Sequence, residues 1–215
     1  MADRFDTQLI ELGITLTEKQ KRQFHRYYEL LVEWNKVMNL TGITEYDEVN
    51  EKHFVDSLAI IKAVNMEEIH SVIDIGTGAG FPGIPLKIAF PHLKVVLLDS
   101  LQKRIRFLDT VIEELGLEEV ETLHGRAEDY AKRKEYREQF DLCVSRAVAN
   151  LATLSEHSLY LCRWILCFLQ ERKCRRGIER IKKSNQVAWR RTVWCCEIPV
   201  AGNGDRKIIC TDKKE

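Results

Sequence analysis

Apolar residues recur at spacings of three and four along the first sixty residues of the chain. Thr17 and Gln20 have the pattern of a capping box, and the sequence after them predicts an amphipathic helix that ends at residues 39–42. Its apolar stripe comprises Phe24, Tyr27, Tyr28, Leu31, Trp34 and Met38. A second helical stretch over residues 47–64 places Val49, Phe54, Leu58 and Ile61 on one face. We therefore expect a small helical N-terminal subdomain over residues 1–66.

From residue 71 the pattern changes to short apolar runs that alternate with helical segments. The runs at residues 72–75, 95–99, 120–123 and 140–144 have the length and composition of buried parallel strands. Helical stretches at residues 85–90, 103–115 and 127–136 separate them. Such alternation predicts a parallel sheet with right-handed crossovers. We therefore expect an α/β, Rossmann-like domain over residues 67–215.

Composition places the chain among ordinary soluble proteins. Of its 215 residues, 45% are hydrophobic and 31% are charged, and no apolar run approaches the roughly 20 residues that a membrane span needs. The first residues lack the basic and apolar regions of an export signal, so we expect a cytoplasmic monomer with no membrane role. Seven cysteines without a Cys-x-x-Cys pair argue against a disulfide framework or a structural zinc site.

The segment 74–83 is a cluster of glycines directly after the first predicted strand. Glycines at this place let the backbone approach a ligand at the open end of the sheet, where doubly wound folds bind nucleotides. A plain tight turn is the alternative. A dinucleotide fingerprint would need its third glycine at Phe81. The pattern is instead Gly-x-Gly-x-Gly, beginning with Gly76 and Gly78, and it resembles motif I of S-adenosylmethionine-dependent methyltransferases.

Two further segments follow strands at the same predicted edge of the sheet. Asp99 comes 23 residues after Gly76, a position that suits a carboxylate accepting both ribose hydroxyls of an adenosine; the alternative is a solvated loop residue. Ala127 and Glu128 follow the third strand, where methyltransferases of this fold hold the adenine. An equally plausible role for Glu128 is to stabilise the N-terminus of the following helix through its negative charge, without contacting a ligand.

The segment 145–150, after the fourth strand, lacks the motifs of two methyltransferase classes. It has neither the Asn/Asp-Pro-Pro-aromatic motif of enzymes that methylate exocyclic amines nor the Pro-Cys nucleophile of 5-methylcytosine enzymes. Cys143 lies within an apolar run, and we interpret it as a core residue rather than a nucleophile. His92 and His124 are interpreted as surface or packing residues, and no cluster has the spacing of a metal site.

Several segments together resemble one family, the bacterial small-subunit ribosomal RNA guanine-N7 methyltransferases known as RsmG or GidB. The similar segments run in order over about residues 5–157: Trp34-Asn35-Lys36, Asn39-Leu40-Thr41, His53 to Leu58, Asp74 to Pro85, Leu98-Asp99-Ser100, Lys103-Arg104 and Ser145-Arg146-Ala147. The resemblance implies a Rossmann-like methyltransferase fold, S-adenosylmethionine as cofactor, and 16S rRNA or the small ribosomal subunit as partner.

The resemblance also implies roles for individual residues. The expected cofactor contacts are Gly76, Gly78, Phe81, Asp99, Ala127, Glu128 and Arg146. Lys103, Arg104 and Arg146 are expected to orient the cofactor or RNA phosphates. Guanine N7 carries a lone pair and no proton, so we expect no catalytic acid or base, and positioning is the main demand. Because the major groove of A-form RNA is deep and narrow, the target guanine should lie in a loop or exposed junction.

The stretch 162–196 departs from this pattern. It holds five of the seven cysteines, three of the four tryptophans, and ten Lys and Arg residues against two Asp and Glu. The fold requires a glycine turn, a fifth strand and a helix here, and the sequence pattern predicts none of them. Residues 198–209 again resemble the last hairpin of the family. We hypothesise a local frameshift over residues 162–196, which resequencing of the gene tests; a basic RNA-binding insert with aromatic residues is the alternative.

Three functions follow from these observations. The leading hypothesis is an S-adenosylmethionine-dependent methyltransferase that acts on N7 of a guanine in 16S rRNA. A small-molecule methyltransferase fits the glycine loop equally well but does not account for the family-like N-terminal segments. The third function is a catalytically inactive nucleotide- or RNA-binding protein, which applies if the stretch 162–196 does not result from a frameshift.

Overall fold

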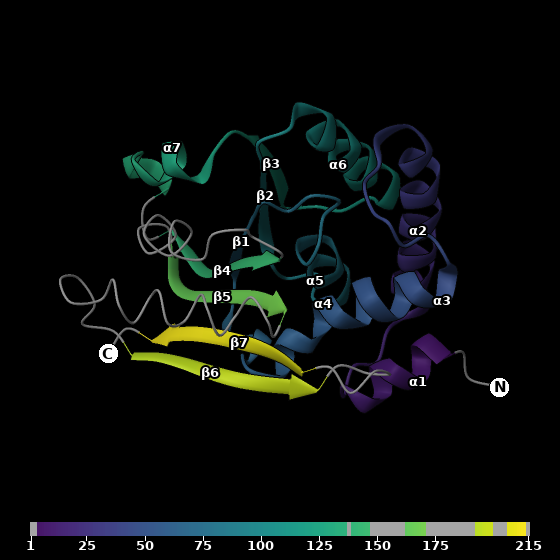
Figure 1. Ribbon diagram of the computed structural model, residues 1–215, viewed down its shortest axis with the longest axis horizontal. Coiled ribbons are helices and arrows are strands. Elements are labelled where there is room, and N and C mark those ends of the chain that lie inside the picture. The colour runs from purple at the N-terminus through teal and green to yellow at the C-terminus, as the bar shows by residue number, and fades with distance from the viewer. Residues whose placement is uncertain (1–3, 137–138, 147–161, 171–191, 200–205, 214–215) are drawn as a thin grey trace.

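A seven-stranded sheet forms the centre of the molecule in the computed structural model, which describes residues 4–136, 139–146, 162–170, 192–199 and 206–213 (Figure 1). The strands are β1 Ser71–Ile75, β2 Lys94–Asp99, β3 Val120–His124, β4 Phe140–Arg146, β5 Cys162–Gln170, β6 Thr192–Pro199 and β7 Arg206–Lys213. They lie in the order β3-β2-β1-β4-β5-β7-β6. Strands β1 to β5 pair in parallel, whereas β7 is antiparallel to both β5 and β6. The predicted α/β fold with a parallel sheet is confirmed.

Helices surround the strands that come first in the chain. They are α1 Arg4–Glu11, α2 Glu18–Met38, α3 Tyr46–Val49, α4 Asp56–Leu58, α5 Gly83–Ala89, α6 Gln102–Leu115 and α7 Ala127–Ala131. A π-helical turn, Asn50–Val55, joins α3 to α4, and short 3-10 turns cover Ala59–Lys62, Met66–Glu68 and Lys134–Tyr136. In Figure 1, α2 and α3 lie at the right-hand edge, with α4 and α5 between them and the strands. In the part of the chain that the structure describes, no helix combines the length and apolar character that crossing a membrane requires.

Helix α2 begins and ends where the sequence predicts. The Thr17 hydroxyl accepts the Gln20 amide, and the Gln20 side chain accepts the Thr17 amide in return, which completes the capping box. At the other end Asn39 adopts a left-handed conformation with φ of 50° and closes the helix. The predicted apolar stripe is buried at Phe24, Tyr27 and Leu31. Propensity and burial therefore favour the same helix.

The N-terminal helices share one hydrophobic core with the sheet. Phe5, Phe24 and Tyr27 pack against Phe54, and Tyr27 and Phe54 in turn contact Phe81 in the glycine loop after β1. These rings belong to a single cluster that also includes residues of β1, β2 and β4. The predicted boundary between residues 66 and 67 is not tested by this packing and stays a prediction.

The C-terminal strands correct one prediction. Residues 162–196 do supply a fifth strand: β5 pairs in parallel with β4 from Phe140↔Cys162 to Arg146↔Phe168. The apolar run Ile165-Leu166-Cys167-Phe168-Leu169 favours this strand, but the many charged residues that follow it weaken its signal in the sequence pattern. The predicted last hairpin is confirmed in position, with β6 and β7 extending beyond residues 198–209. Residues 171–191 lie outside the described residues, and the frameshift hypothesis stays untested.

Candidate functional site

The glycine loop joins β1 to α5 at the carboxyl edge of the sheet. Gly76 and Gly78 have φ of +68° and +64°, in the left-handed region that side chains disfavour. The amides of Gly76 and Thr77 both donate to the Leu98 carbonyl, at 2.8 and 3.2 Å, so the loop is tied to the end of β2. A Cβ atom added at Gly76 would meet no atom within 4 Å. The loop therefore presents open backbone on one side, as contact with a ligand requires.

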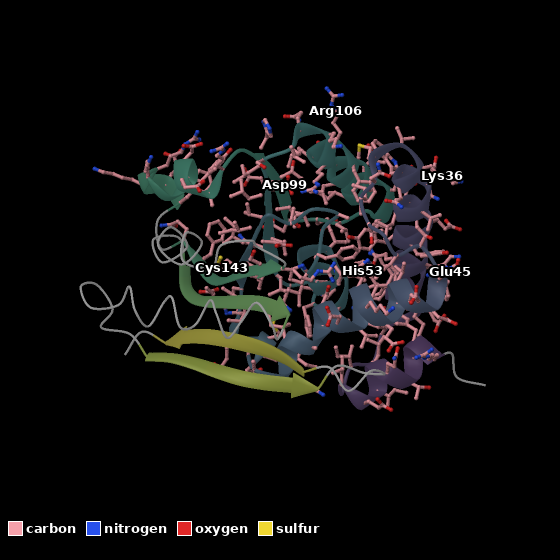
Figure 2. All side chains as sticks on the ribbon, viewed as in Figure 1. Lys36, Glu45, His53, Asp99, Arg106 and Cys143 are labelled. Carbon is pink, nitrogen blue, oxygen red and sulfur yellow. The ribbon has the colours of Figure 1, made fainter. Side chains whose placement is uncertain are left out.

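Asp99 connects the glycine loop to the loop after β3. Its carboxylate is only 2% exposed and accepts the Gly78 amide at 2.9 Å and the Leu101 amide at 2.9 Å. Its backbone carbonyl accepts the Gly125 amide at 3.0 Å. Figure 2 places Asp99 near the middle of the molecule, below α6. Asp99 thus connects the segments that follow β1, β2 and β3, the first two through its carboxylate and the third through its backbone carbonyl.

The two basic residues predicted to face the cofactor or RNA lie differently. Arg104 turns toward Asp99, with Nη1 at 3.2 Å from Oδ2, and its side chain is about one-third exposed. Lys103 is exposed at the start of α6. Arg104 therefore belongs to the rim of the Asp99 site, whereas Lys103 faces solvent.

Ala127 and Glu128 begin α7 beside this edge. Both are partly exposed, and the preceding Gly125 packs so closely that an added Cβ would lie 2.8 Å from the Tyr130 ring. The Tyr130 hydroxyl donates to the His124 carbonyl at 3.1 Å, which holds the start of α7 against the end of β3. The two residues predicted at the adenine are thus on the same edge as Asp99.

Arg146, at the end of β4, lies over Phe81 of the glycine loop. Its guanidinium carbon is 4.6 Å from the Phe81 ring centre, and Nη1 is 3.6 Å from the Asp56 carboxylate and 3.3 Å from the Lys52 carbonyl. Burial lowers the pKa of Arg146, and the Asp56 charge opposes this shift. The next residues, 147–150, lie outside the described residues. Arg146 therefore joins the N-terminal helices to the glycine loop.

His53 completes the group around Phe81. The His53 ring stacks on the Phe81 ring with centres 4.7 Å apart, and Nδ1 is 3.3 Å from Nη2 of Arg146. Its Nε2 lies 2.8 Å from the Thr41 hydroxyl. In Figure 2, His53 lies in the interior, whereas Lys36 and Glu45 lie at the outer edge. The segments that contain Thr41, His53 and Asp56 resemble the family, but the sequence pattern predicts no role for these residues. Only the folded chain brings them to Arg146.

Asp74 is a further residue that sequence reasoning missed. It is fully buried in β1, and Oδ2 accepts the Thr77 hydroxyl at 2.7 Å and the Gly83 amide at 2.8 Å. Among the described residues, its Oδ1 has no hydrogen-bond partner. Burial raises its pKa from 3.8 to about 7, against the opposing effect of these two donors. The sequence signal for such a residue is a carboxylate inside an otherwise apolar strand, since a buried charge there needs a reason.

The remaining predictions concern single side chains. Cys143 is fully buried in β4, which confirms it as a core residue. His92 lies 3.2 Å from the carbonyls of Met66 and Ile69, and His124 lies 3.1 Å from the carbonyl of Ser100. Within the described ranges, no three side chains of the kinds that bind metals gather at one place.

The residues at this edge fit an adenosine-containing cofactor. A buried carboxylate at the end of β2 is suited to accept hydrogen bonds from hydroxyl groups, and the space beside Gly76 leaves room for a ligand against the loop. The unpartnered Oδ1 of Asp74 adds a buried polar atom directly behind that loop. In the described residues this edge therefore combines open backbone and a buried carboxylate, which suit a nucleoside, with Arg104 at the rim.

Comparisons with known proteins identify similar sequences. The model of a family described as rRNA small subunit methyltransferase G matches residues 20–207. Ribosomal RNA small subunit methyltransferase G of Lachnoclostridium phytofermentans is 55% identical over 148 residues, and that of Brevibacillus brevis is 55% identical over 157 residues. These alignments cover 69% and 73% of this chain, but only 61% and 66% of the relatives' own length.

Solved structures with the same fold are methyltransferases. An O-methyltransferase from Bacillus cereus in complex with SAH superposes with a TM-score of 0.64 and 19% identity, and covers 97% of this chain and 96% of that one. The N-terminal domain of human METTL16 in complex with SAH gives a TM-score of 0.54 and 16% identity, and covers 78% of this chain and 70% of that one. At these identities the likeness establishes the fold.

Proposed function

Because this chain belongs to the rRNA small subunit methyltransferase G family, we propose that it transfers a methyl group from S-adenosylmethionine to N7 of a guanine in 16S rRNA. The observation that carries the proposal is the convergence of three strand ends on Asp99. Its carboxylate accepts the amides of Gly78 in the glycine loop and of Leu101 before α6, and its backbone carbonyl accepts the amide of Gly125 before α7. This is the arrangement that an adenosine-containing methyl donor needs.

In this proposal the cofactor lies along the carboxyl edge of the sheet. The residues assigned to it are Gly76, Gly78, Phe81, Asp99, Ala127, Glu128 and Arg146. Gly76 and Gly78 offer backbone without a side chain, and Asp99 accepts the ribose hydroxyls. The ring of Phe81 is 4% exposed and packs inside the protein, so its role is to hold the loop from below. Arg146 rests on that ring and forms the side of the site nearest β4.

The proposed reaction requires this chain to position the two reactants and not to transfer a proton. Held by Gly76, Gly78 and Asp99, S-adenosylmethionine would supply an activated methyl group for transfer to the lone pair of guanine N7. N7 bears no proton, so this chain would need no general base. Holding the two reactants in line is the main source of rate enhancement. Asp99, which is buried and holds the glycine loop, and Arg146, which is partly exposed and paired with Asp56, are suited to that task.

The RNA in this proposal approaches the same edge. Lys103 is exposed at the start of α6, four residues after Asp99, and is assigned to an RNA phosphate. Arg104 and Arg146 are assigned to the boundary between cofactor and RNA, since both have partners inside the site. We also infer a cytoplasmic, monomeric protein that acts on 16S rRNA or on the assembling small subunit, with a helical subdomain over residues 1–66 and a catalytic domain over 67–215.

Methyl transfer to defined substrates tests this function. The full chain is incubated with radiolabelled S-adenosylmethionine and either small ribosomal subunits or naked 16S rRNA, both from cells that lack this methyltransferase. We expect labelled 7-methylguanosine after digestion to nucleosides, and none from the large subunit as control. Calorimetric titration with S-adenosylmethionine is done in parallel. Absence of cofactor binding would remove both methyltransferase hypotheses, whereas binding without RNA methylation would favour a small-molecule substrate.

A further inference from the structure

We propose that Tyr27 of helix α2 is a positioning residue for the cofactor loop, so that the N-terminal helices set the loop's affinity for its ligand. The inference rests on the proposed function in taking S-adenosylmethionine as that ligand. Its starting observation is independent of it: the Tyr27 hydroxyl donates a hydrogen bond to the carbonyl of Ala79 in the middle of the glycine loop.

This hydrogen bond is sealed from solvent. Tyr27 is completely buried, and Ala79 is 5% exposed. A buried backbone carbonyl that loses its donor retains the full cost of its desolvation, and water cannot replace the donor where there is no room for it. Burial also raises the pKa of Tyr27 well above its usual value, so the hydroxyl keeps its proton and remains a donor throughout the physiological range.

The loop and the tyrosine approach as closely as backbone permits. At Gly80, whose φ is +96°, an added Cβ would lie 2.7 Å from the Tyr27 hydroxyl and 2.7 Å from Cγ1 of Ile84. The Tyr27 ring stacks on Phe54 with centres 5.3 Å apart and lies 5.5 Å from the ring of Phe81. The Tyr27 hydroxyl therefore reaches the loop only because residue 80 has no side chain.

Helix α2 is itself fixed to the domain that carries the loop. The side-chain amide of Gln20 donates to the carbonyl of Ile88 at 2.8 Å and to that of Ala89 at 3.1 Å, at the end of α5. The side-chain amide of Gln23 donates to the carbonyl of Leu115 at 2.8 Å, at the end of α6. Tyr27 thus extends from a helix that cannot move independently of α5 and α6.

Two successive residues of the loop are consequently held from opposite directions. Asp99 accepts the amide of Gly78, and Tyr27 donates to the carbonyl of Ala79. With both groups fixed, the orientation of the peptide group between them is set before a ligand arrives. Such preorganisation lowers the cost of binding, because less loop freedom is lost when the ligand binds.

The test compares two tyrosines of the same helix. Tyr27→Phe removes only the hydroxyl on the loop. Tyr28→Phe is the matched control, because its hydroxyl donates to the carbonyl of Thr44 at 3.1 Å at an exposed position away from the loop. Dissociation constants for S-adenosylmethionine and for S-adenosylhomocysteine are measured by calorimetry on full-length variants with a wild-type circular dichroism spectrum.

We expect about a tenfold weaker affinity for Tyr27→Phe, as the loss of one buried hydrogen bond to the loop implies, and no change for Tyr28→Phe. In the methylation assay the KM for S-adenosylmethionine should rise with kcat within about twofold, since positioning of the loop acts on cofactor binding. Hydrogen exchange should become faster at the amides of Gly80 and Phe81 in Tyr27→Phe alone.

The outcomes separate this proposal from the proposed function. A lower melting temperature for Tyr27→Phe with unchanged cofactor affinity and unchanged exchange in the loop would overturn the positioning role. A wild-type chain that binds no S-adenosylmethionine would overturn the proposed function, whereas the exchange comparison would still decide whether Tyr27 holds the loop. Equal losses of affinity in both variants would also overturn the proposal, because the effect would then belong to the helix as a whole.

Discussion

Asp99 Oδ2 accepts the backbone amide of Gly78 at 2.9 Å, so the carboxylate at the end of β2 holds the glycine loop that follows β1. The same oxygen is 3.2 Å from Arg104. One side chain therefore holds the glycine loop and also pairs with Arg104 at the rim of the site. Four predictions follow from this arrangement and its neighbours, each with its own measurement.

Replacing Asp99 by Asn should weaken binding of S-adenosylmethionine by about 10- to 100-fold. The amide keeps the shape of the side chain but loses the charge that strengthens its hydrogen bonds, and such bonds contribute about 1.5–3 kcal/mol. Calorimetric titration measures the change. Asp109→Asn is the control, because Asp109 lies exposed on α6 and accepts the Thr122 hydroxyl far from the loop. Equal affinities for the two variants would show that Asp99 is not part of the cofactor site.

Replacing Asp74 by Asn should make the protein less sensitive to pH. Burial raises the folded-state pKa of Asp74 from its ordinary value of 3.8 to about 7, so the folded protein retains a proton that the unfolded chain has lost. The stability that this proton contributes is fully present below about pH 4 and is lost as the pH rises to about 7. Relative to the wild type, Asp74→Asn should therefore gain ~3 kcal/mol between pH 5 and pH 8.

Urea unfolding at several pH values measures this difference. Thr77→Val is the matched variant, because it retains the carboxyl group and removes one of its two donors. It should keep a pH dependence that is displaced to higher pH, because the Thr77 hydroxyl lowers the pKa of Asp74, while Asp74→Asn loses it. A constant difference between wild type and Asp74→Asn from pH 5 to pH 8 would contradict the raised pKa.

Replacing Arg146 by Leu should destabilise the fold by about 3 kcal/mol. The variant removes the guanidinium beside the Asp56 carboxylate, which is 2% exposed, and removing one partner of a buried ion pair is costly. Adding Asp56→Asn to this variant should restore part of the stability, since the pair then holds no charge. Urea denaturation of the wild type, the two single variants and the double variant checks both statements. If the double variant is as unstable as the sum of the two single variants, the ion pair does not carry the effect.

Three glycine substitutions separate backbone strain from crowding. Gly80→Ala should destabilise by about 3 kcal/mol or more, because φ is +96° and the new methyl group would lie 2.7 Å from both Tyr27 and Ile84. Gly13→Ala has positive φ but open space, and should cost about 1 kcal/mol. Gly42→Ala has neither and should change stability by less than about 0.5 kcal/mol. Thermal melts rank the three, and a similar loss in Gly80 and Gly13 variants would exclude crowding.

Local pattern was sufficient for most of the elements. The runs at 72–75, 95–99, 120–123 and 140–144 became β1 to β4 with bounds shifted by one or two residues. For β1, β2 and β4 the reason is that a strand covered on both faces needs an apolar stretch, whereas β3 lies at the edge of the sheet and buries only Leu123. The capping box at Thr17 located the start of α2 for a similarly local reason. Helix α1 and strand β5 were not predicted, since a short helix and a run beside many charges carry weak periodic signals.

The positions of the glycine loop, of the carboxylate 23 residues after Gly76 and of the family-like segments around Thr41, His53 and Arg146 follow from local sequence alone. Which of these residues touch depends on how the chain folds. Tyr27 and Ala79 are 52 residues apart, and His53 and Arg146 are 93 residues apart, yet each pair is in direct contact. Contacts between such distant residues depend on how helices and sheet pack around a shared core, and the spacing of residues along the chain does not contain that information.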